Sequence, residues 1–275
     1  MWKFPRQSSL VGPLGYRGGV SEVQIVTPRG IRLSGTFVVP VDSTDAAVIF
    51  SHSVFDDRMS GLHFKRLASI YRSMGYATVK FDYSGHGLSD DDVVTFSNQA
   101  EDLRAVSGWL ADQGFRRQLI HGHSFGTLAP MKAAPSPVKT MILSAPITGP
   151  LDYDWEDVFS VSQLDELEMK GFTTISDDSP GPRAEFLVSR DSLAQLSLND
   201  PKKLLGHLEV PVLLIHDADD IRRGLTELTM EASSLLPEGS HVETVEDASF
   251  GQGNNLEKLS DLSGSWARAH VPVRP

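Results

Sequence analysis

Short apolar runs alternate with amphipathic stretches along most of this chain. Residues 46–52 (AAVIFSH) form a continuous apolar run, which is typical of a strand buried on both faces, and residues 62–74 follow with helical spacing. The same patterns predict strands at residues 23–27, 31–39, 76–81, 117–122, 138–144, 210–216 and 241–245, and helices at 97–113 (with Ser97 as N-cap), 125–134, 224–236 and 255–270. Strands that alternate with helices indicate an α/β fold with a mostly parallel sheet and helices on both faces.

Residues 150–203 interrupt this alternation. They are rich in Asp, Ser, Gly and Pro and show no strong strand pattern. Ligands bind at the carboxyl edge of open α/β sheets, so we expect this insertion to form a short cap over that edge. The alternative is a structural excursion without a role at the site. We expect residues 1–275 to form one domain that contains this insertion.

The composition excludes several classes of function. The chain has 25 Lys and Arg against 36 Asp and Glu, a net charge of −11, which disfavours nucleic-acid partners and a polybasic membrane anchor. The absence of cysteine excludes disulfides, thiolate nucleophiles and zinc–thiolate sites. No run of 18 apolar residues is present, and the first ten residues lack the apolar core of a secretory signal. We therefore expect a cytoplasmic protein, with no indication of its oligomeric state.

One motif in the chain carries nucleophile chemistry. Gly122-His123-Ser124-Phe125-Gly126 is a G-x-S-x-G sequence between an apolar strand and a helix of small residues. Glycines allow a sharp turn there, which would expose the Ser124 hydroxyl and aim the Phe125 N–H at an oxyanion. This setting favours a nucleophile elbow over an ordinary loop.

Three further segments support a resemblance. They are residues 82–90 (DYSGHGLSD), residues 51–53 (SHS) and residues 210–220 (VPVLLIHDADD). Together with the elbow, they resemble the α/β-hydrolase fold family, in particular small esterases and acyl-aminopeptidase-like serine hydrolases with a short cap. The resemblance implies Ser124 as the nucleophile, Asp220 as the acid, and the N–H groups of Val54 and Phe125 as the oxyanion hole. It implies no cofactor and no metal.

The histidine of the family is missing from its usual place. It follows the last strand, where this chain has Phe250, and no histidine lies between His241 and His270. Serine is a weak nucleophile without a base, so either another histidine serves or the chemistry differs. His52, near the expected oxyanion loop, and His241, which opens the last strand, are the alternative bases that the sequence offers.

Three functional hypotheses follow. The first is a serine hydrolase or acyltransferase acting on a small ester, thioester or lactone. The second is a non-hydrolytic enzyme, such as a cyclase, lyase or isomerase of a biosynthetic intermediate, on the same scaffold. The third is a non-catalytic ligand-binding protein or an inactivated variant. All three imply a small-molecule ligand, and the sequence does not identify it.

Overall fold

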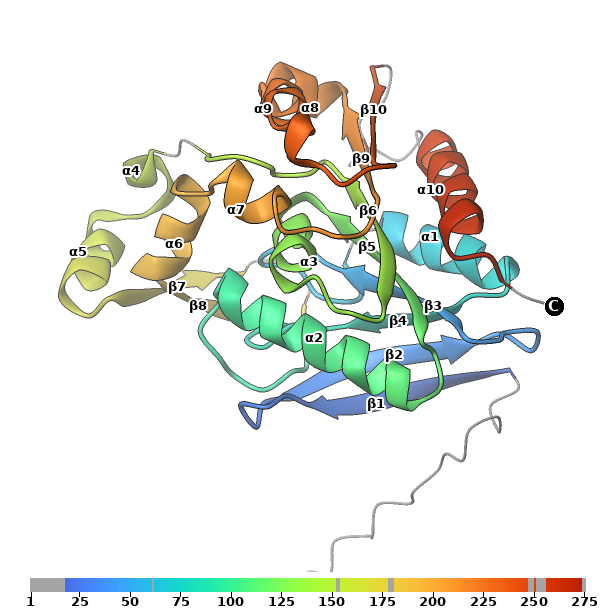
Figure 1. Cartoon of the computed structure of the whole chain (residues 1–275). Helices are drawn as coiled ribbons and strands as arrows, with labels where there is room; N and C mark the ends of the chain where they lie inside the picture. The colour runs from blue at the N-terminus through green and yellow to red at the C-terminus, as the bar shows by residue number, and fades with distance from the viewer. Residues whose placement is uncertain are drawn as a thin grey trace, which may run out of the picture.

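An eight-stranded sheet forms the centre of the protein (Figure 1). The computed structural model describes residues 18–60, 62–151, 154–177, 181–246, 250 and 256–273. The strand order is β1-β2-β4-β3-β5-β6-β9-β10. The pairs β1–β2 and β2–β4 are antiparallel, and all the later pairs in this order are parallel. The strands are β1 (Gly19–Val26), β2 (Arg32–Val39), β3 (Ala46–Ser51), β4 (Ala77–Phe81), β5 (Arg117–His123), β6 (Val138–Ser144), β9 (Val212–Asp217) and β10 (His241–Val245). The predicted α/β fold with a mostly parallel sheet is confirmed.

Helices cover both faces of this sheet. α1 (Leu62–Ser73) and α10 (Leu256–His270) pack on one face. α2 (Phe96–Asp112), α3 (Leu128–Ala133), α7 (Pro201–Leu205) and α9 (Leu225–Glu231) pack on the other. The residues of β3 belong in turn to the core on one face of the sheet and to the core on the other, because successive side chains of a strand point to opposite faces. This explains why β3 is apolar along its whole length.

The start of α2 differs from the sequence-based expectation. Its N-cap is Thr95 rather than Ser97, and the Thr95 hydroxyl accepts a hydrogen bond from the N–H of Asn98 at 3.0 Å. Both residues are suitable caps by composition. A contact outside the helix decides which of the two is the cap. Val94 forms a β-bridge with Val188, which keeps the backbone extended up to Thr95, so the helix begins after Thr95.

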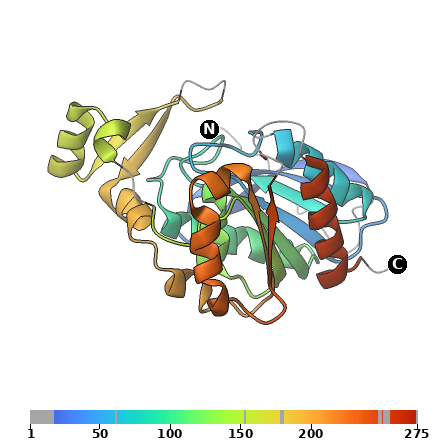
Figure 2. The same ribbon diagram turned by 90° about the horizontal axis from the view of Figure 1, so that it is seen from above.

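Between β6 and β9 the chain leaves the sheet and forms the segment that we call the cap. It contains α4 (Trp155–Val158), α5 (Val161–Met169), β7 (Phe172–Ser176), β8 (Glu185–Ser189) and α6 (Arg190–Ser197). Figures 1 and 2 show the cap standing out from one side of the molecule. The sequence of this segment shows no strong strand pattern, whereas β7 and β8 pair there as an antiparallel hairpin. Its inward side chains pack in a small core of their own with Val94, Phe159 and Leu167.

Polar contacts attach the cap to the segment that follows β4. The guanidinium of Arg183 pairs with Asp91 at 2.7 Å and donates to the carbonyl of Ser89 at 2.6 Å. The Ser192 hydroxyl of α6 donates to the carbonyl of Val94. The cap is therefore fixed beside the carboxyl edge of the sheet, where the strand ends meet.

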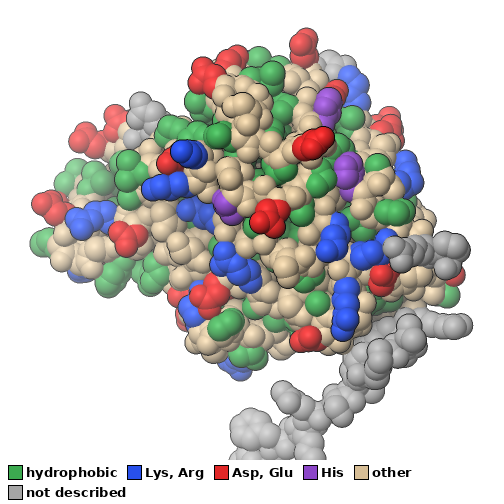
Figure 3. Space-filling model, in the orientation of Figure 1, with side chains coloured by type: hydrophobic (Ala, Val, Ile, Leu, Met, Phe, Trp, Pro, Cys, Tyr) green, Lys and Arg blue, Asp and Glu red, His purple; other side chains and the backbone are tan. Residues whose placement is uncertain are grey.

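The surface carries charges of both signs, interspersed over the face shown in Figure 3. Apolar side chains gather over the cap, which exposes Val158, Val161, Met169 and Phe172. Among the helices that the structure describes, none is long and apolar enough to cross a membrane.

The turn after β5 packs directly on the end of β3. A Cβ atom at Gly126 would lie 2.3 Å from the carbonyl oxygen of Ser51 and 2.4 Å from that of His52. The Ser51 hydroxyl donates to the carbonyl of Gly126 at 2.5 Å and lies 2.6 Å from the hydroxyl of Tyr83. Only glycine permits this approach, so position 126 joins the ends of β3 and β5.

Replacing Gly126 by alanine is therefore expected to lower the free energy of unfolding by about 3 kcal/mol, since backbone atoms must move apart to admit the methyl group. Gly108 in α2 is the matched control, because a Cβ there meets nothing within 4 Å. Gly108→Ala should raise stability by about 0.5–1 kcal/mol. Urea denaturation measures both. Equal stability of the two variants would contradict the packing argument.

Candidate active site

Ser124 stands at the apex of the turn that ends β5. Its φ is 53°, a left-handed value that is uncommon and costly for a residue with a side chain. A 3₁₀ turn, η1 (Ser124–Thr127), follows and leads into α3. The half-buried Ser124 hydroxyl has no hydrogen-bond partner among the residues that the structure describes. The geometry is that of a strained strand–turn–helix elbow that presents a free hydroxyl.

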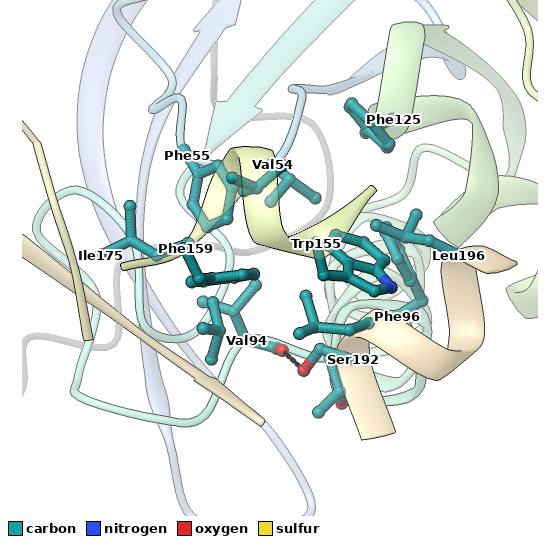
Figure 4. A pocket seen from close by; sticks show the side chains of 14 residues that line it. Val54, Phe55, Val94, Phe96, Phe125, Trp155, Phe159, Ile175, Ser192 and Leu196 are labelled. Carbon is teal, nitrogen blue, oxygen red and sulfur yellow. Dashed lines mark hydrogen bonds between the residues drawn. The ribbon is translucent and has the colours of Figure 1, made fainter. Parts of the chain in front are cut away.

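Two backbone N–H groups beside the elbow are also free. Phe125 lies in the first turn of η1, where an N–H has no partner within the helix. Val54 follows β3, the neighbour of β5 in the sheet, and Figure 4 shows Val54 and Phe125 at the same cavity. In the described part of the chain, neither N–H donates to any group. Two such donors beside a serine are the arrangement that stabilises an oxyanion.

Asp82 fixes the loop that carries Val54. Its carboxylate is buried, accepts the N–H of Arg58 at 2.7 Å and that of Leu88 at 2.9 Å, and pairs with the Arg58 guanidinium. The loop after β3 and the loop after β4 are thus joined by a desolvated ion pair. Asp82 therefore holds the loop that carries Val54 in place.

Asp220, the predicted acid, faces the interior on the α9 side. It is 2% exposed, and its Oδ2 lies 3.2 Å from Nδ1 of His216 and 3.3 Å from the N–H of Asp217. Nε2 of His216 lies 2.9 Å from the hydroxyl of Thr229, which in turn lies 2.7 Å from that of Thr148. Asp220 thus has an imidazole partner, His216, that sequence reasoning missed. The only signal was the spacing of four residues between them.

Phe250 occupies a buried position among the side chains between the sheet, α1 and α10. It is 2% exposed, and its N–H donates to Oδ2 of Asp217 at 2.7 Å. The other oxygen of Asp217 caps the short helix α8 (Ala218–Arg222) by accepting the N–H groups of Asp219 and Asp220. Residues 247–249 and 251–255, on either side of Phe250, lie outside the described residues.

His52 and His241, the alternative bases that the sequence offers, are both engaged in other contacts. Both ring nitrogens of His52 are engaged, Nδ1 with the carbonyl of Ser53 at 2.8 Å and Nε2 with the N–H of Tyr83 at 3.1 Å. Burial lowers the pKa of His52. His241 begins β10, three strands from β5 in the sheet, or about 14 Å at the usual strand spacing. It is exposed and lies 3.0 Å from Glu243. The structure brings neither ring to Ser124.

An apolar cavity of about 210 Å³ lies between the cap and the core, beside the elbow (Figure 4). Its walls come from both parts, and the side chains labelled in Figure 4 include Val54, Phe55, Phe96, Phe125, Trp155 and Leu196. The hydroxyls in the lining are already used, since Ser192 donates to Val94 and Thr95 caps α2. The cavity therefore suits an apolar group.

No group of three metal-ligating side chains is arranged to hold an ion within the described ranges.

The comparisons with known proteins agree with this architecture. Residues 48–255 match the sequence profile of the alpha/beta hydrolase family. No curated protein sequence matches the chain. The alpha/beta hydrolase GrgF from Penicillium sp. sh18 has a TM-score of 0.73 and 16% identity over 92% of this chain and 99% of its own.

Two esterase structures are also similar. Est1E from Butyrivibrio proteoclasticus, bound to ferulic acid, has a TM-score of 0.69 and 18% identity over 90% of this chain and 99% of its own. The esterase EaEST from Exiguobacterium antarcticum has a TM-score of 0.67 and 18% identity over 90% of this chain and 100% of its own. At these identities the structures show a common fold. With the match over residues 48–255, they establish that the chain belongs to the alpha/beta hydrolase family.

Proposed function

We propose that this protein is an esterase-like enzyme that uses Ser124 to take an acyl group from a small ester, thioester or lactone. One observation carries the proposal: a strained elbow presents a free hydroxyl beside two free N–H groups and an apolar cavity. Family membership and the esterase-type neighbours support the same class of reaction.

The geometry suits acyl transfer. Oγ of Ser124 attacks the carbonyl carbon, and the oxygen of the tetrahedral intermediate accepts hydrogen bonds from the N–H groups of Val54 and Phe125. Collapse of the intermediate expels the alcohol or thiol and leaves an ester on Ser124. Water or a second alcohol then removes the acyl group, which makes the enzyme a hydrolase or an acyltransferase.

The cavity indicates the kind of group that is bound. A cavity of about 150 Å³ holds a benzene ring, so one of about 210 Å³ has room for a somewhat larger apolar group. This is the size of a medium-chain acyl group or a substituted ring. None of the described residues that line the cavity is charged. We therefore propose a small-molecule substrate whose acyl portion is apolar.

A non-hydrolytic enzyme is the second candidate, and the state of the predicted acid and base favours it. Asp220 is paired with His216, and Phe250 stands where the resemblance places the family's histidine. Removal of an acyl group by water needs an activated water molecule, so a weak base hinders this half of the reaction most. On this reading, the free N–H groups would hold an enolate or alkoxide. A binding protein without catalysis would use the same cavity.

Ser124→Ala should abolish both labelling by an alkyl fluorophosphonate and turnover of nitrophenyl esters, because the attacking oxygen is removed. Ser97→Ala, at an exposed serine at the start of α2, is the control and should behave as the parent protein. Intact-protein mass spectrometry detects the adduct. A parent protein that is never labelled, or a Ser124→Ala variant that is still labelled, would count against the proposal.

Chain-length preference tests the cavity. Each buried methylene contributes about 0.8 kcal/mol, so kcat/KM for nitrophenyl esters should rise with acyl length until the cavity is full. Leu196→Trp fills part of the cavity and should shift the best substrate to a shorter chain by roughly two carbons. Leu198→Trp, next to the same helix but 77% exposed, is the control and should leave the optimum unchanged. If kcat/KM depended on acyl length in the same way in both variants, the acyl group would not bind in this cavity.

A further inference from the structure

All nine histidines of the chain lie within the described residues, so each can be considered as the base for Ser124. His52 and His216 have both ring nitrogens engaged. Exposed His207 and His241 lie in the turn after α7 and at the start of β10, and His270 stacks on Trp266 at the end of α10. None of these five presents a free nitrogen to the elbow.

Two more histidines are sealed in the interior. His86 and His121 are fully buried, with Nδ1 engaged by the carbonyl of Ser84 and the hydroxyl of Tyr71 respectively. His86 lies after β4, and β3 separates β4 from β5. His121 lies two residues below His123 on β5, among aromatic rings of β3 and α1. Only His63 and His123 remain.

His63 and His123 form a pair beside the elbow. Their ring centroids are 4.4 Å apart, and His123 immediately precedes Ser124. The Ser144 hydroxyl donates to the carbonyl of Gly122, so Nδ1 of His123 donates to Ser144 at 3.0 Å. This contact holds the His123 ring against the sheet.

His63 also has a ring nitrogen without a partner. It lies in the first turn of α1, which follows the loop that carries Val54, and its Nε2 is buried without a hydrogen-bond partner within the described ranges. Burial lowers its pKa to about 4, so the ring is neutral at pH 7 and its acceptor lone pair is available. Burial also lowers the pKa of His123 to about 3. Nε2 of His63, which has no partner, thus belongs to a ring that contacts His123, the residue before Ser124, whose hydroxyl also has no partner among the described residues.

The face of the sheet is also the appropriate one. Phe250 packs with side chains of α1 and α10, including Phe64, which follows His63 in the chain. The resemblance places the family's histidine at position 250, and α1, which carries His63, packs on the same face of the sheet as Phe250. The positive φ of Ser124 interrupts the strand alternation at the end of β5.

We infer that His63 is the proton acceptor for Ser124, and that His123 positions its ring. This assignment rests on the proposed function. As the bond from Oγ to the acyl carbon forms, the Ser124 proton passes to Nε2 of His63. His63 returns it to the leaving oxygen as the ester bond breaks. In the second half, a proton of the attacking water passes to His63 and then to Ser124. No carboxylate pairs with His63 among the described residues, which predicts a slow enzyme.

The test compares His63→Gln and His63→Ala with the parent, using fluorophosphonate labelling, kcat and KM for an apolar nitrophenyl ester, and thermal unfolding. General base catalysis contributes about 100-fold or more, so kcat and the labelling rate should fall by at least about that factor, with KM and the unfolding midpoint nearly unchanged. His207→Gln, at an exposed histidine, is the control and should match the parent.

Variants of His63 that are labelled and turn over as fast as the parent would overturn the assignment and leave the proposed function standing. A parent that is not labelled at Ser124 at all would overturn both. A loss of labelling in Ala but not in Gln, with a lowered unfolding midpoint in Ala alone, would show that His63 only fills space, and it would also overturn the assignment.

Discussion

The contact between the β5 turn and the end of β3 is the constraint on which the site depends. Gly126 lies against the carbonyl oxygens of Ser51 and His52 at distances that no side chain permits. The Ser51 hydroxyl then links this turn to Tyr83, at the end of β4. Three strand ends are thereby held together, and the N–H groups of Val54 and Phe125 come to lie beside one hydroxyl. Because position 126 has no side chain, these strand ends can meet at the candidate site.

The carboxylates of Asp220 and Asp217 are held by different contacts from those that hold the turn at Ser124. A buried carboxylate without a partner costs several kcal/mol, and Asp220 avoids this through His216 and a backbone N–H. Asp217 avoids it by capping α8 and holding the N–H of Phe250. Both carboxylates are therefore satisfied without a histidine in the loop after β10. Phe250 at this position therefore leaves neither carboxylate without a partner.

Much of this architecture could be predicted from the sequence. The apolar runs located the strands of the central sheet, because doubly buried strands need apolar residues on both faces. The hairpin β7–β8 was missed because its strands bury only alternate side chains, in a small core with Val94, Phe159 and Leu167 that is separate from the sheet. Thr95 rather than Ser97 caps α2 because of a bridge to a strand more than 90 residues away in the sequence.

In the candidate site, too, some features follow from adjacent residues and others depend on contacts between distant parts of the chain. Ser124 and the two N–H groups follow from a local motif, since a strand, a sharp turn and a helix N-terminus are encoded by adjacent residues. The orientation of the Asp220 carboxylate does not follow from a local motif. The fold of α8 decides whether this carboxylate meets His216 or the loop after β10. His63 carries no motif at all, and only the packing of α1 on β5 brings it to His123.

A crystal structure of the protein after reaction with a medium-chain alkyl fluorophosphonate tests the central claim most directly. The account predicts phosphorus bonded to Oγ of Ser124, its free oxygen within hydrogen-bond distance of the N–H groups of Val54 and Phe125, and the alkyl chain in the cavity beside Phe96 and Trp155. An unmodified Ser124, or a phosphoryl oxygen that points away from both N–H groups, would contradict it.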